Sequence, residues 1–281
     1  EFAEAAEAGE FSFGMTNPQA SNSGFSALVA VATALADTGD AIAPADLERV
    51  GPRLQQLFQA QSMVSGSSGW LAEAFADDPE RADAIVNYES TLHQMRQQGQ
   101  PIEVVVPADG VISADYPLSA LSQPANADAR ERVDKLANWL LEHQAELADT
   151  FRRPVTQVDN LPAEIAGQQV IELPFPANQG VVDELLYAYD NSYRQPGTTT
   201  FVLDTSGSME GERIASLKDI MHSLIDGSAS TLTGDVSLRD RENVTLQSFD
   251  SRPNAPVTAR FSHEDPAAAA ELTKYVDGLS A

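Results

Sequence analysis

A carboxylate and two hydroxyls occupy alternate positions in one short stretch, at Asp204, Ser206 and Ser208. The apolar run 200–203 precedes them, and a helical pattern begins near Glu212. They therefore follow the end of an expected buried strand, the edge at which open α/β sheets bind ligands. Carboxylate and hydroxyl oxygens suit Mg²⁺, with Mn²⁺ or Ca²⁺ as alternatives. Three such donors leave open metal positions for an outside carboxylate.

The segments that follow this motif alternate between helix and strand patterns. An apolar stripe with helical spacing over 213–225 predicts an amphipathic helix. Residues 244–249 and 257–261 predict two further strands, and 266–279 predict another helix. The alternative is a Ser/Gly-rich turn in which Asp204 only caps a helix. The order of strand, motif, helix and strand favours the metal site.

The pattern D-x-S-G-S over 204–208, after an apolar strand, resembles the metal-ion-dependent adhesion site of von Willebrand factor type A domains. The resemblance implies a doubly wound α/β sheet and a metal held by the three side chains directly or through water. It also implies a protein partner whose acidic residue binds that metal. In this family a Thr and an Asp on two later loops complete the site. The chain ends at Ala281, so we expect 196–281 to be the N-terminal part of such a domain, with a metal site that lacks these two later ligands.

A second constellation lies near the start of the chain. The strand pattern 11–16 leads into a Ser/Asn/Gly turn before an apolar helix, and the loop 65–69 repeats this design. Helix N-termini leave backbone N–H groups unpaired and attract anions. The alternative is that these serines are ordinary helix caps. The candidate ligand-binding residues are Thr16, Asn17, Ser21, Ser23, Gly24, Ser65, Ser67 and Tyr88.

The run T-N-P…S-x-S-G-F over 16–25 resembles the second lobe of type 2 extracellular solute-binding proteins, loosely over 11–154. The resemblance implies an α/β lobe that binds a small polar or anionic solute. The N-terminal half of the first lobe is missing, so we expect no complete two-lobed clamp from this chain alone.

These patterns divide the chain into a solute-binding-like lobe over 1–155, a connector over 156–195 with a short helix at 181–189, and the type A portion. Within the lobe we expect Trp70 and Trp139 in the core. Further predicted elements are helices at 25–35, 46–61, 70–75, 89–98 and 127–151, and strands at 84–88 and 102–106.

Composition excludes several classes of function. The chain has 281 residues and a net charge of −25, which disfavours nucleic acid and anionic membrane surfaces as partners. It has no Cys, and its four His are scattered. No apolar run is long enough to span a bilayer, so membrane association would need an anchor upstream of Glu1.

No phosphate-binding glycine loop, nucleophile elbow or second aspartate of a phosphoaspartate enzyme is present. We therefore expect a non-enzymatic binding protein. The pairing of the two resemblances implies an extracytoplasmic protein of the bacterial cell envelope. The alternatives are the solute receptor of an ABC-type importer and an adaptor subunit of a metal-chelatase or ATPase machine.

Overall fold

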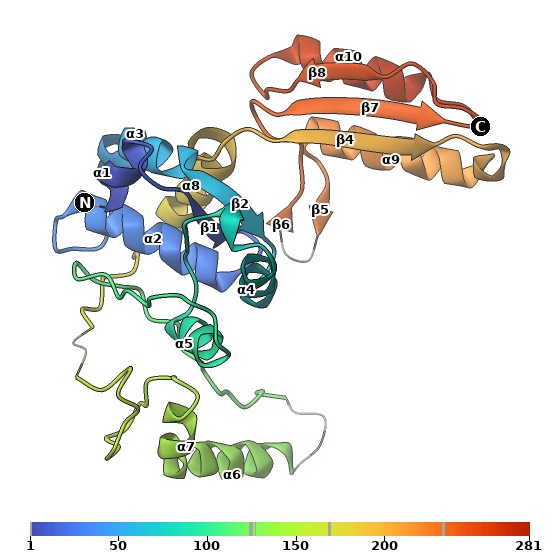
Figure 1. Cartoon of the computed structure of the whole chain (residues 1–281). Helices are drawn as coiled ribbons and strands as arrows, with labels where there is room; N and C mark the ends of the chain where they lie inside the picture. The colour runs from blue at the N-terminus through green and yellow to red at the C-terminus, as the bar shows by residue number, and fades with distance from the viewer. Residues whose placement is uncertain (1, 124–125, 127, 168–169, 232–233) are drawn as a thin grey trace. The chain divides into compact units, whose positions relative to one another are not determined.

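The computed structural model describes residues 2–123, 126, 128–167, 170–231 and 234–281 (Figure 1). The chain divides into two compact units, Glu1–Leu186 and Tyr187–Ala281. The first contains a parallel three-stranded sheet and the second a mixed three-stranded sheet. The protein is therefore of the mixed α/β class. The boundary between the units lies within 156–195.

The sheet of the first unit has the order β2-β1-β3, with all pairs parallel. Because parallel neighbours need a crossover, a helix begins after each strand. All three helix N-termini therefore start from one edge of the sheet. The strands are β1 (Phe13–Thr16), β2 (Gln61–Ser65) and β3 (Ala84–Ile85), and the helices that follow them are α2 (Asn22–Ala36), α4 (Ser68–Asp77) and α5 (Glu89–Gln97).

Other helices of this unit surround the sheet or lie beyond it. In α3, Leu54, Leu57 and Phe58 are fully buried, as the apolar stripe of its sequence predicts. The short helix expected at 181–189 corresponds to α8. These helices are α1 (Phe2–Glu7), α3 (Pro44–Gln59), α6 (Ala129–Glu142), α7 (Gln144–Ala148) and α8 (Gln179–Ala188).

Several predicted elements of the first unit were wrong. Strand β2 begins at the last residue of a predicted helix, ends at the first residue of a predicted loop and was not itself predicted, and the strand expected at 102–106 does not form. The helix expected at 127–151 is broken at His143, whose backbone leaves the helical region. Its predicted first residue, Ala127, and residues 168–169 of the connector lie outside the described residues.

The two tryptophans were also misplaced by sequence reasoning. Trp70 is 66% exposed and Trp139 is 47% exposed, so neither belongs to the core. Trp139 instead stacks on His143, with ring centroids 4.1 Å apart. Apolar character alone did not reveal that these helix faces lack a covering element.

The second unit has the strand order β4-β7-β8. Strands β4 and β7 are parallel because α9 carries the chain between them, whereas β8 returns antiparallel after a short loop. The elements are β4 (Thr198–Asp204), α9 (Glu212–Asp226), β5 (Ser230–Thr231), β6 (Gly234–Asp235), β7 (Asn243–Phe249), β8 (Val257–Arg260) and α10 (Pro266–Asp277).

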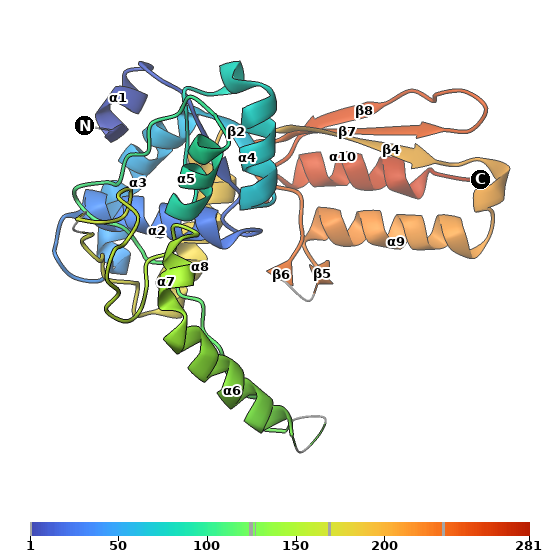
Figure 2. The same cartoon turned by 60° about the horizontal axis from the view of Figure 1, so that its bottom comes forward.

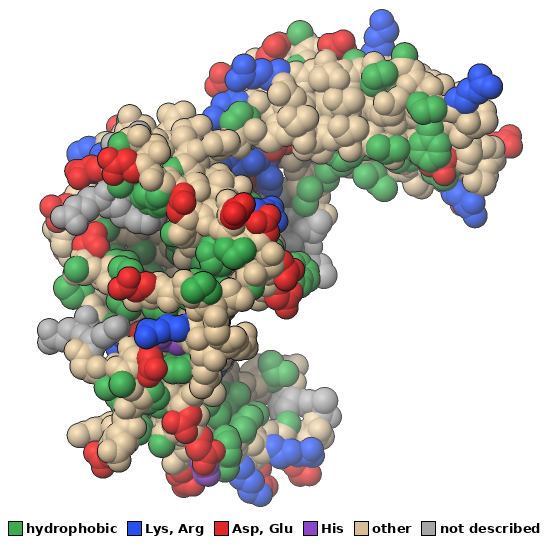
Figure 3. Space-filling view, viewed as in Figure 1, with side chains coloured by type: hydrophobic (Ala, Val, Ile, Leu, Met, Phe, Trp, Pro, Cys, Tyr) green, Lys and Arg blue, Asp and Glu red, His purple; other side chains and the backbone are tan. Residues whose placement is uncertain are grey.

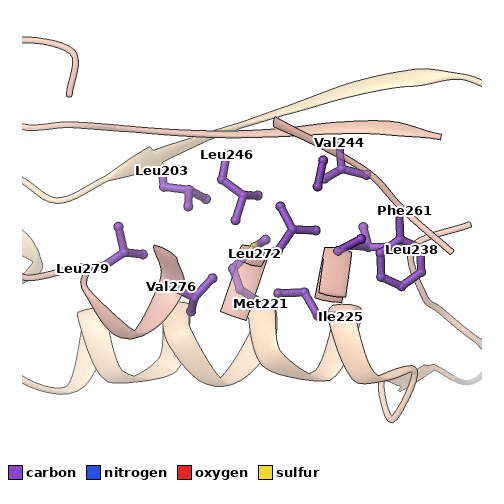
Figure 4. Close-up of a cluster of buried hydrophobic side chains, with 12 residues drawn as sticks. Leu203, Met221, Ile225, Leu238, Val244, Leu246, Phe261, Leu272, Val276 and Leu279 are labelled. Atoms are coloured by element: carbon purple, nitrogen blue, oxygen red, sulfur yellow. The ribbon is translucent and has the colours of Figure 1, made fainter. Parts of the chain in front are cut away.

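Helices α9 and α10 pack side by side on one face of this sheet (Figure 2). Figure 4 shows Met221 of α9 and Leu272 of α10 pointing toward Leu203 and Leu246 of the strands. On the opposite face Val202 is 65% exposed. A doubly wound sheet carries helices on both faces. In the described part of residues 187–281, both helices share one face.

A network of ion pairs lies at the amino-terminal end of this sheet. In it the buried Asp190 pairs with Arg194 and Arg239. Arg241 donates to the carbonyl oxygens of Asn191 (2.7 Å) and Arg194 (2.8 Å), which fixes the π-helix Tyr189–Tyr193. Burial raises the pKa of Asp190, although Arg239 and Arg194 oppose that shift. This network lies at the end of the sheet away from the predicted metal motif.

No helix among the described residues combines the length and the apolarity needed to cross a membrane.

Candidate functional site

The three predicted metal ligands lie in one loop at the carboxyl end of β4. Asp204 is the last residue of that strand. Its Oδ1 accepts the backbone N–H of Ser206 at 2.8 Å. The hydroxyl oxygens of Ser206 and Ser208 are 3.1 Å apart. The structure therefore gathers one carboxylate and two hydroxyls at a sheet edge where ligands bind in α/β folds.

Local hydrogen bonds stabilise the ionised form of the Asp204 carboxyl. The Ser206 backbone N–H is the main cause that lowers the pKa of Asp204 below its usual 3.8, and the Ser206 side chain adds to the effect. The carboxylate is partly exposed, so it remains accessible from solvent. An ionised, accessible carboxylate is what a hard divalent cation requires.

The donor set fits a Mg²⁺-type ion but contains only one carboxylate. Among the described residues, no group of three or more His, Asp or Glu side chains could hold a metal. A metal at Asp204 therefore depends on the hydroxyls of Ser206 and Ser208 and on water for most of its shell.

Thr205 anchors the loop after β4 to the end of β7, a role that the sequence analysis did not predict. It is only 5% exposed. Its N–H and its Oγ1 both donate to the carbonyl oxygen of Phe249, at 2.8 and 2.9 Å. Because Asp204 and Phe249 are register partners, these bonds tie the loop to the end of β7. Asp204, Thr205 and Ser206 are all polar, so no alternation in the sequence marked Thr205 as inward-facing.

Asp250 is a second carboxylate at this edge that the sequence analysis missed. It directly follows β7, beside the end of β4. Its Oδ1 accepts the Arg252 N–H at 3.0 Å and the Ser251 hydroxyl at 2.9 Å. The Arg252 N–H lowers the pKa of Asp250, so its charge adds to the negative potential of this edge.

In the first unit, Thr16 and Ser23 are buried and bonded to each other, with hydroxyl oxygens 2.8 Å apart. The Ser21 hydroxyl lies 3.1 Å from that of Ser23 and makes no helix cap. A Cβ on Gly24 would lie 2.2 Å from the carbonyl oxygen of Thr16. This part of the predicted solute site therefore holds α2 tightly against β1.

The second predicted loop is likewise engaged in local bonds. Ser67 caps α4 by accepting the Trp70 N–H at 3.2 Å, and the Ser65 hydroxyl donates to the carbonyl of Ser67. Asn17 joins the two loops through a 2.8 Å bond from its N–H to the Ser65 carbonyl. The sheet edge thus brings the predicted residues together, and Ser67 acts there as a helix cap.

Tyr88 completes this edge at the start of α5. Its hydroxyl accepts from the Asn22 side chain at 3.3 Å, which links α5 to α2. The next residue, Glu89, forms a bidentate ion pair with Arg153, with both bonds at 2.8 Å. Sequence reasoning missed Arg153 because it lies 64 residues along the chain.

No protein-family model, curated protein or solved structure matches this chain. The functional reading therefore depends on the chemistry of the two sheet edges.

Proposed function

We propose that the chain is a non-enzymatic binding protein whose second unit presents a divalent cation to an acidic residue of a protein partner. One observation supports this proposal most directly. The loop after β4 holds Asp204, Ser206 and Ser208 together at one exposed sheet edge. Mg²⁺ is the favoured ion, with Mn²⁺ and Ca²⁺ as alternatives. The bound metal would act as a Lewis acid for an oxygen of the partner's carboxylate.

The order of elements supports a type A reading of residues 196–281. A parallel strand ends at the motif, an amphipathic helix follows, and the next strand pairs with the first. Helices α9 and α10 both pack on one face of the sheet, and this alone does not distinguish a type A domain from other α/β folds. On this reading the protein is extracytoplasmic, and the first unit is a solute-binding-like lobe that serves as a platform.

A solute receptor of an ABC-type importer is the second candidate. The observation that favours it is the convergence of three helix N-termini at the edge of β2-β1-β3. The mutual hydrogen bond of buried Thr16 and Ser23 weighs against it, because these hydroxyls are already paired. An adaptor role in a chelatase or ATPase machine would use the same metal loop, so the partner would distinguish it.

The test is a calorimetric titration of the whole chain with Mg²⁺ and with Mn²⁺ at 0.15 M KCl, a salt concentration that screens diffuse attraction. We expect one saturable site in the native chain. Asp204→Ala removes that site, because Asp204 supplies the only carboxylate among the three proposed ligands Asp204, Ser206 and Ser208.

The matched control is Asp219→Ala, which removes one charge from an exposed position of α9. It should leave metal binding unchanged. Equal loss in both variants, or no saturable binding in the native chain, would contradict the proposal and leave the motif as a strand-to-helix turn.

A further inference from the structure

A cavity of about 520 Å³ opens at the carboxyl ends of β4 and β7, beside the metal loop. Its floor contains the buried side chains of Thr205, Ser248 and Leu279. The partly buried Val257 and Tyr275 form its walls, and the exposed residues of its lining form the rim. The volume lies in the range of pockets that bind small ligands or side chains.

The polar groups of the floor are already paired with one another. The Tyr275 hydroxyl accepts the Ser248 N–H at 2.9 Å and lies 3.0 Å from the Ser248 hydroxyl. Asn254 donates to that same hydroxyl at 3.1 Å. Because these groups are satisfied, a guest need not supply hydrogen bonds to the floor. What the cavity offers a guest is the apolar surface of Val257, Leu279 and the Tyr275 ring.

The cavity adjoins the residues that would hold the metal. Thr205 lines it and lies between Asp204 and Ser206 in the chain. A peptide advances at most about 3.6 Å per residue. A partner segment whose carboxylate reaches the metal is therefore long enough to place a side chain one or two residues away at this cavity.

We infer that this cavity binds an apolar or aromatic side chain located within two residues of the partner's acidic residue. The inference rests on the proposed function, because the metal sets where the partner segment lies. The partner is thus a protein with an exposed segment that combines Asp or Glu with a residue such as Leu or Phe. Lys274 and Glu271 lie at the rim and are exposed to solvent.

The probes are blocked peptides, Ac-Gly-Asp-Xaa-Gly-NH₂ and Ac-Gly-Asp-Gly-Xaa-Gly-NH₂, with Xaa as Gly, Ser, Leu or Phe. Their binding to the whole chain is followed by NMR titration at saturating Mg²⁺. Burial of such a side chain should make Leu or Phe bind on the order of tenfold more tightly than Gly in at least one series.

Two variants test the location. Ala255→Trp fills the cavity from its exposed rim and should abolish the preference while the Gly peptide still binds. Ala267→Trp, an exposed position in the first turn of α10, should keep the preference.

The outcomes separate the two claims. Binding that requires Mg²⁺ but shows no preference for Leu or Phe would overturn the cavity inference and leave the proposed function standing. A preference that survives Ala255→Trp would also overturn it. If no peptide binds with Mg²⁺, including the Gly peptides, both claims fail.

Discussion

Asp204 is ionised at neutral pH, and hydrogen bonds from Ser206 lower the pKa of its carboxyl further. The Ser206 N–H bond is local, so it forms whenever the turn after β4 forms. A metal ion that binds here meets a carboxylate that needs no deprotonation near neutral pH. The hydroxyls of Ser206 and Ser208 then decide how well the ion is held.

The first prediction concerns pH. Since the pKa of Asp204 is lowered below 3.8, this carboxylate stays ionised down to that range. Mg²⁺ affinity should therefore be the same at pH 7 and pH 5, and should fall only as pH drops through the lowered pKa. Calorimetry at the two pH values measures this. A tenfold loss at pH 5 would show that a group with a higher pKa controls the site.

The second prediction concerns two glycines, one in the first turn of α2 and one in the first turn of α4. Gly24→Ala should destabilise the first unit by roughly 1–3 kcal/mol or more, because the new Cβ overlaps the Thr16 carbonyl. Gly69→Ala meets nothing within 4 Å and should stabilise α4 by about 0.5–1 kcal/mol.

Urea unfolding followed by tryptophan fluorescence reports on this unit, since both tryptophans, Trp70 and Trp139, lie within it. Equal effects of the two substitutions would contradict the close approach of α2 to β1.

At the scale of elements, sequence periodicity correctly predicted segments whose apolar residues form a stripe and pack against another element of the same unit. The helix predicted at 213–225 corresponds to α9, and the strand predicted at 244–249 to β7, each within one residue at either end. Their apolar residues repeat at the period of the element that they form.

Elements whose fate depends on distant partners could not be predicted. Residues 102–106 have strand-forming side chains but no neighbouring strand, so no ladder forms. Strand β2 is short and half polar, and only its pairing with β1 defines it. The candidate site followed the same rule, since Asp204 was visible in the sequence whereas Asp250 required the β4–β7 register.

A third prediction tests the link between α10 and the sheet edge. Tyr275→Phe removes the acceptor of the buried Ser248 N–H and should cost about 1–3 kcal/mol in the second unit. The Ser248 amide should then exchange its hydrogen with solvent much faster, as measured by NMR. Tyr116→Phe, at a position 70% exposed, is the matched control and should change neither quantity. Unchanged protection in Tyr275→Phe would contradict the link.

At the scale of the whole molecule, negative charge is concentrated in the first unit. Residues 1–186 contain 28 acidic and 9 basic side chains, against 14 and 8 in residues 187–281. Figure 3 shows acidic side chains spread over the visible surface and not gathered in one patch. Such charge attracts cations diffusely without forming a site.

The fourth prediction separates diffuse attraction from specific binding. Raising KCl from 50 to 300 mM shortens the screening length to about two fifths and should remove most weak, multiple Mg²⁺ uptake. The saturable site at Asp204 should remain, with a smaller loss of affinity, because direct ligation does not depend on the long-range field. Calorimetry at both salt concentrations measures this. Loss of all binding at 300 mM KCl would mean that the chain attracts Mg²⁺ only through its net charge.

The most direct test of the metal site locates the ion itself. Substoichiometric Mn²⁺ broadens the NMR signals of nearby amides, so a ¹⁵N-labelled chain reports where the ion binds. We predict that the amides of Ser206, Gly207 and Ser208 broaden first, and that Asp204→Ala abolishes this effect. Broadening centred on another part of the chain, or unchanged in Asp204→Ala, would contradict the assignment of the loop after β4 as a metal site.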